Sequence, residues 1–360
     1  MCPNLEIFVV DWPMWTAFGR VADALCTYCA KSLRSVHWQV PSEALPKVIW
    51  SLDTLQSLRS AYIEIEAPTN ETLHFGSAAG LHLELGNLQQ LCLRGHVQDF
   101  VEQVAGWSLP SLRSLSLDFF KTNDLPDIIE FLAQHGSQLT FLDLNCVPTL
   151  DTAAILDLCP FLTTFTFNAD WYLSIPGDNA PSDAITFVNR PHQNITYIGC
   201  HGLLDAFGVG YGSEIHMRLF QRANEKNMAA LTKVNFPNLK IVRVLSRTLL
   251  RSLEKNDGPE QECLQRWDRW WTQFTRMGVR LEDCTGAMLG TLPQEEGMDD
   301  NESDDSDEGT ESEDEDGDEV VVEGPRLGDG TINELRQLLE ECWKMSEDRE
   351  ERNFPQVGWQ

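Results

Sequence analysis

The sequence predicts an α/β fold in which short strands alternate with helical returns. The first observation is a motif of the form L-x-x-L-x-L, which occurs at Leu112–Leu117, Leu139–Leu144 and Leu162–Phe167. The second is spacing: these frames start 27 (139 minus 112) and 23 (162 minus 139) residues apart. The third is that the apolar period changes from two inside the frames to 3.6 between them. Together they predict an irregular leucine-rich-repeat solenoid, a curved horseshoe.

Weaker copies of the frame extend this pattern in both directions. Nine frames start at positions 5, 33, 55, 88, 112, 139, 162, 195 and 239. The steps vary from 22 (55 minus 33) to 44 (239 minus 195), which indicates insertions. Four frames carry proline two residues before the first apolar place, where it favours an extended entry: Pro3, Pro110, Pro160 and Pro237.

Between the frames, apolar residues recur at helical spacing. Helices are expected over Val97–Val104, Leu125–Leu132 and Ala153–Leu158. Residues 174–192 and 201–213 are rich in turn-forming residues and are expected to be inserted loops.

An aromatic helix and a last strand are expected to close the repeat array. The helix lies within Pro259–Phe274, with its apolar face made of Leu264, Trp267, Trp271 and Phe274. The strand follows at Val279–Asp283.

Composition divides the chain into four predicted parts. Residues 1–290 form the repeat domain, and 291–330 form a disordered linker, since 295–319 contain 16 Asp and Glu and no Lys or Arg. The capping box Thr331–Glu334 starts an amphipathic helix over 331–347. Residues 348–360 form a flexible tail. The first frame has no capping segment before it, so either the first repeat is exposed or, as we favour, the natural chain begins earlier.

Charge and hydropathy argue against several classes of function. The net charge of −29 disfavours binding to nucleic acid, and no stretch is long and apolar enough to cross a membrane. No secretory signal is recognisable, so a cytoplasmic or nuclear location is expected. The ten cysteines are scattered and fit reduced, buried thiols.

Motifs for catalysis, cofactors or metals are weak. Cys26 and Cys29 form a lone C-x-x-C, whereas a zinc site needs about four ligands. The glycines of Gly208–Gly212 lack the spacing of a nucleotide-binding loop. We therefore expect no catalytic residue, no cofactor and no metal. Thr310 and Ser312 precede acidic residues at the third following position and are candidate phosphorylation sites; alternatively, the acidic run is only a spacer.

The strand surface is the predicted binding site. In each frame the leucines enter the core, while the third, fifth and seventh places point outward. Stacked strands align such places into one surface, which solenoids use for binding. The candidate protein-binding residues are Gln90, Cys92, Arg94, Ser114, Ser116, Asp118, Phe141, Asp143, Asn145, Thr164, Thr166 and Asn168.

The frame entries Cys2–Leu5, Leu109–Leu112 and Cys159–Leu162, with the segment from Trp267 through Gly286, resemble fungal (basidiomycete) F-box proteins with leucine-rich repeats. The resemblance covers about residues 1–290 and does not include the F-box itself, a helical module that is normally N-terminal. It implies the substrate-recognition part of a ubiquitin-ligase adaptor. The implied partners are a protein destined for ubiquitination and, if an F-box precedes this sequence, the linker subunit of the ligase.

The sequence thus predicts a non-catalytic protein–protein interaction module, with no nucleic-acid or membrane partner. The alternatives are a stand-alone repeat scaffold without ligase association and an enzyme that uses the 201–213 loop.

Overall fold

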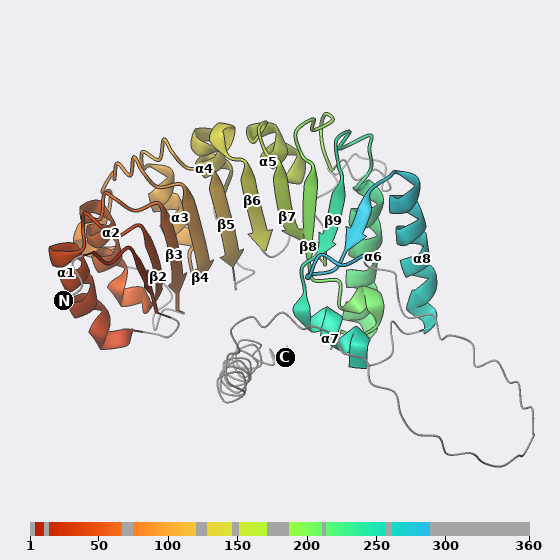
Figure 1. The fold of residues 1–360 in the computed structure, drawn as a ribbon, viewed down its shortest axis with the longest axis horizontal. Helices are drawn as coiled ribbons and strands as arrows, with labels where there is room; N and C mark the ends of the chain where they lie inside the picture. The colour runs from red at the N-terminus through yellow and green to blue at the C-terminus, as the bar shows by residue number, and fades with distance from the viewer. Residues whose placement is uncertain are drawn as a thin grey trace, which may run out of the picture. The chain divides into compact units, whose positions relative to one another are not determined.

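The computed structural model contains one parallel β-sheet whose strands follow the order of the chain from β1 to β10. It describes residues 4–10, 14–66, 75–119, 128–145, 151–170, 187–210, 214–255 and 261–288. Each strand pairs in parallel with the next, and the sheet curves so that the helices lie along its outer side (Figure 1). Parallel neighbours require a crossover, and short helices supply most of these returns.

The ten strands are three to six residues long. Their bounds are β1 Ile7–Val9, β2 Ser35–Val40, β3 Ser60–Ile65, β4 Gln90–Gly95, β5 Ser114–Phe119, β6 Phe141–Asn145, β7 Thr164–Asn168, β8 Tyr197–His201, β9 Ile241–Val244 and β10 Arg280–Glu282.

Eight α-helices are present in the described residues, with five short 3-10 helices. The α-helices are α1 Phe18–Tyr28, α2 Leu45–Thr54, α3 Gln98–Ala105, α4 Ile128–His135, α5 Thr152–Leu158, α6 Glu214–Ala230, α7 Arg247–Lys255 and α8 Gln261–Arg276. The 3-10 helices are η1 Trp15–Ala17, η2 Ser42–Ala44, η3 Gly76–Ala78, η4 Gly136–Gln138 and η5 Asp205–Phe207.

Strand positions agree with eight of the nine predicted frames. In these eight, the strand begins at the third place of the frame, as in β5 after Leu112 and β8 after Ile195. The frame predicted at Leu55 is wrong: β3 begins at Ser60, so the frame starts at Leu58. Its fourth place is Ala61, whose small side chain hid the motif, and Leu55 packs in the turn before it.

The core lies between the inward side of the sheet and the helices. One row of buried side chains crosses six neighbouring strands in register: Leu91, Leu115, Leu142, Phe165, Ile198 and Val242. Helices contribute buried aromatic rings, among them Phe18, Phe100 and Phe131. These apolar contacts hold each strand–helix unit against its neighbours.

Predicted helices α3 and α5 and the last strand, β10, are confirmed. For α4, the described part begins at Ile128, and residues 125–127 lie outside the described residues. Within the predicted 201–213 loop, His201 ends β8 and Asp205–Phe207 form η5. This segment is therefore not a simple surface loop, because the side chains of Leu203 and Phe207 are buried in the core.

The prediction for the buried face of the closing helix α8 is half right. Trp267 and Phe274 are buried as predicted, whereas Leu264 and Trp271 are 36% and 37% exposed and Cys263 and Trp270 are buried instead. Phe207 decides the rotation of the helix, since its ring meets both Trp267 and Trp270 edge-on, with ring centroids 4.7 and 6.0 Å apart.

All described residues belong to one compact unit, Met1–Gly297. None of its described helices is both long and apolar enough to span a bilayer. The predicted acidic linker with Thr310 and Ser312, the helix over 331–347 and the tail lie outside the described residues.

Candidate functional site

The outward side of the sheet carries three rows of side chains, which we call the polar face. The first row is Ser35, Ser60, Gln90, Ser114, Phe141, Thr164, Tyr197 and Ile241. The middle row is His37, Tyr62, Cys92, Ser116, Asp143, Thr166, Gly199 and Arg243. The last row is Gln39, Glu64, Arg94, Asp118, Asn145, Asn168 and His201. Between β6 and β7, this row is connected by the side-chain hydrogen bond from Asn168 to Asn145.

The twelve residues predicted for the strand surface all lie on β4 to β7 within these rows. Their alignment follows from the parallel register, which places equivalent frame positions on adjacent strands about 4.8 Å apart. Most are half-buried, but Thr166 is only 3% exposed, so the middle of the face is more enclosed than an open strand surface.

Asp143 is the centre of a hydrogen-bond network in the middle row. Ser116 Oγ donates to its Oδ2 at 2.9 Å, and the Thr166 hydroxyl donates to its Oδ1. His201 Nε2 lies 2.9 Å from Oδ1, although its strand is two away in the sheet. Three side chains from three strands therefore hold one carboxylate in place.

The last row forms a second chain of contacts across four strands. Arg94 Nε lies 3.2 Å from Asp118 Oδ2, and Asn145 Nδ2 donates to Asp118 Oδ1 at 3.3 Å. Asn168 Nδ2 donates to Asn145 Oδ1 at 3.1 Å. Because these groups contact one another across adjacent strands, their side chains are ordered before any ligand arrives.

The two aspartates of this network have opposite pKa shifts. Burial raises the pKa of Asp118, and the charges of Arg94 and His201 offset this only in part. Burial also acts to raise the pKa of Asp143, but the hydrogen bonds from His201, Thr166 and Ser116 and the His201 charge outweigh it. The pKa of Asp143 therefore lies below its ordinary value, and this carboxylate stays ionised.

The first row differs in chemistry, because it carries no charged side chain from β2 to β9. It includes two aromatic rings, Phe141 and Tyr197. The guanidinium carbon of Arg243 lies 5.4 Å from the centre of the Tyr197 ring, and Arg243 Nη2 pairs with Glu282 Oε2 at 2.6 Å. A neutral strip with two aromatic rings thus borders the charged network, and Arg243 of the middle row lies against the Tyr197 ring.

Several residues of the face were not predicted. Tyr197, His201 and Arg243 occupy outward places of the frames at 195 and 239, so the rule that found the central residues could have found them. Tyr62 and Glu64 lie on β3, which is outside the four central frames and whose frame was placed three residues early. Glu282 lies in the predicted last strand, but it belongs to no frame, so its side of the sheet was not predicted.

The cysteine pair weighed for metal binding lies at the C-terminal end of α1, and the described glycines of the 208–212 run follow η5. Cys26 and Cys29 take part in no disulfide, and in the described part of the chain no three His, Cys, Asp or Glu side chains gather as a metal site would require. Burial raises the pKa of Cys92 to about 11 and that of Cys200 to about 12, so both thiols are protonated at neutral pH. Gly208 adopts a left-handed turn after η5.

No protein-family model matches the chain, and no curated protein matches it either. The function is therefore inferred from the polar face.

Proposed function

We propose that this chain is a non-catalytic protein-binding module and that its partner contacts the polar face. The observation that carries the proposal is the in-register alignment of outward side chains over β2 to β9. Interfaces are enriched in aromatic residues and arginine, and their strongest anchors are often Tyr, Trp and Arg. Tyr197 with Arg243, and Phe141 two strands away, offer such anchors.

The internal hydrogen bonds of the face favour recognition of a folded or extended protein surface. The network around Asp143 is already paired, so a partner need not order these side chains on binding. The neutral first row can exclude water from an interface, while the last row supplies charged groups at the opposite edge of the polar face.

More specifically, we propose that the chain is an irregular leucine-rich-repeat solenoid and that it recognises substrates for an F-box-type ubiquitin ligase. The regular succession of frame, strand and return supports the repeat architecture. The ligase role rests on the resemblance of residues 1–290 to fungal F-box proteins, and it would operate in the cytoplasm or nucleus. The alternative is a stand-alone leucine-rich-repeat scaffold without a ligase.

The face can be tested by comparing the proteins retained by two variants. Thr164→Arg places a large cation in the centre of the first row, whereas Val234→Arg makes the same kind of change at an exposed side chain outside the three rows. A partner that is retained by the Val234→Arg protein and lost with Thr164→Arg supports the proposal. Equal retention by both variants contradicts it.

The ligase role needs a separate readout in cells that naturally express the protein. If the adaptor assignment is correct, the linker subunit and a cullin should co-purify with the protein, and Thr164→Arg should remove the substrate but keep the linker. Partners that bind the polar face without any linker subunit or cullin would favour the scaffold.

A further inference from the structure

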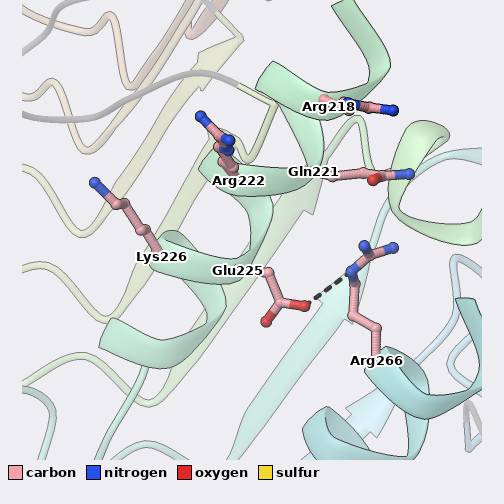
Figure 2. Close-up of a pocket in the computed structure, with 6 residues that line it drawn as sticks. All are labelled: Arg218, Gln221, Arg222, Glu225, Lys226 and Arg266. Carbon is pink, nitrogen blue, oxygen red and sulfur yellow. Dashed lines mark hydrogen bonds and ion pairs between the residues drawn. The ribbon is translucent and has the colours of Figure 1, made fainter. Parts of the chain in front are cut away.

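A second candidate site lies away from the polar face, between α6 and α8. A pocket of about 330 Å³ is lined by Arg218, Gln221, Arg222, Glu225, Lys226 and Arg266 (Figure 2). Five of these residues come from α6, and Arg266 reaches towards them from α8.

Buried contacts fix the orientation of α6, so that its basic side faces the pocket. On the opposite side of the helix, Asn224 Nδ2 donates to the Ala169 carbonyl at 2.8 Å and to Asp170 Oδ1 at 3.0 Å. Asn227 Nδ2 donates to the same carbonyl at 2.9 Å. Both asparagines are fully buried. Rotation of the helix would break these bonds, so the position of its basic side chains is built into the fold.

The pocket concentrates positive charge. Four cations and one carboxylate line it, which gives a net charge of +3 (four minus one) in a chain whose net charge is −29. The carboxylate is already paired, because Glu225 Oε1 accepts from Arg266 Nε at 2.8 Å and from Arg269 Nη2 at 2.6 Å. Arg266 Nη1 also donates to the Ala206 carbonyl at 2.7 Å.

The spacing of the cations indicates a ligand with more than one anionic group. Arg218, Arg222 and Lys226 are four residues apart along one side of α6, so their backbone positions span about 12 Å. A single carboxylate would neutralise only one of the three net charges. Guanidinium groups match phosphate oxygens in two-bond geometry, and a phosphate ester brings up to two charges. The acidic balance of the whole chain disfavours a nucleic acid, and the volume suits a small ligand.

We propose that the pocket between α6 and α8 binds a small ligand that carries two or more phosphate groups. Arg218, Arg222 and Lys226 on α6 would supply three of the cationic contacts, and Arg266 on α8 the fourth. This site is independent of the protein partner proposed for the polar face.

Calorimetric titration of the full chain at physiological salt provides the test. Inorganic phosphate, pyrophosphate and tripolyphosphate are the probes, and affinity should rise at least about tenfold from the first to the last as more cations are engaged. Arg222→Gln should weaken tripolyphosphate binding by about tenfold or more, and Arg222→Lys should restore part of the loss. The matched control is Arg276→Gln, which removes an equal charge from an exposed position of α8 outside the pocket.

Equal losses in the Arg222→Gln and Arg276→Gln proteins would overturn the proposal, as would an absence of tripolyphosphate binding. A second arm uses a phosphoserine peptide to separate the sources of phosphate. If the peptide binds more tightly than tripolyphosphate and depends on Arg222, the assignment to a small ligand is wrong. Loss of binding in Arg222→Gln with an unchanged melting temperature excludes a folding defect.

Discussion

The two sides of the sheet use the same strands for different purposes. The row Leu115, Leu142 and Phe165 points inward and is at most 1% exposed. One residue further along each strand, Ser116, Asp143 and Thr166 point outward and bond to one another. Inward positions are determined by packing. Outward positions carry a polar network that packing does not demand, so they are the positions where binding specificity can reside.

The largest effect is expected from a charge on the inward side. Leu142→Asp would bury an unpaired carboxylate and leave a gap in the core, at a cost of about 4 kcal/mol or more. Thermal unfolding followed by circular dichroism should show loss of the folded domain. The outward control is Thr164→Asp on β7, which should melt within a few degrees of the parent protein. If Leu142→Asp melted normally, the assignment of the two sides would be wrong.

Gly95 at the end of β4 provides the next test. Its φ is +90°, and a Cβ there would lie 2.2 Å from the Ile65 carbonyl oxygen of the adjacent strand. Gly95→Ala should therefore destabilise the sheet by about 2 kcal/mol or more, as measured by urea unfolding. The control is Gly19→Ala in α1, where a Cβ meets nothing within 4 Å. This control should be neutral or slightly stabilising.

Removing the central carboxylate should have a smaller effect. Asp143→Ala leaves the hydroxyls of Ser116 and Thr166 without their acceptor, which should cost about 1–3 kcal/mol in urea unfolding. Asp53→Ala is the control, because that side chain is exposed on α2, and its effect should stay within about 0.5 kcal/mol. Matching effects of the two substitutions would show that the network contributes nothing to folding.

The smallest expected changes are in the two carboxyl pKa values, measured by carbon NMR. Asp143 should titrate below its ordinary value and Asp118 above it. His201→Ala should raise the pKa of Asp143, because it removes a hydrogen bond and a positive charge. Because the pKa of Asp143 is lower in the folded than in the unfolded state, this group stabilises the fold at pH values above its unfolded pKa. This stabilisation is lost as the pH falls through the folded-state pKa. The raised pKa of Asp118 acts oppositely, since protonation favours the folded form.

Much of this fold could be predicted because the same sequence frame recurs and each copy forms the same kind of strand and core contact. Leucine frames identify the inward rows, and parallel register then determines which outward residues meet. The frame of β3 failed because Ala61 replaces a large apolar residue. The reach of His201 to Asp143 depends on a side chain crossing two strands, and no local pattern encodes that contact.

The pocket between α6 and α8 could not be predicted for a related reason. The sequence shows Arg218, Arg222 and Lys226 at helical spacing, but α6 itself was not predicted after the expected 201–213 loop. Arg266 joins this row only through the packing of α8. Trp271 was predicted to be in the core, but Trp270 is buried there instead. This also depends on a residue distant in the sequence, Phe207, which contacts Trp270.

The most direct test of the polar face as a binding surface is photo-crosslinking in cells that express the protein. A photoreactive amino acid replaces Thr164 on the polar face or, in the control, Gln134 at an exposed position of α4 on the helical side. The Thr164 position should yield a discrete cross-linked partner, and addition of Phe141→Arg should abolish it without lowering the melting temperature. Cross-links to the same partner from Gln134, with none from Thr164, would contradict the account.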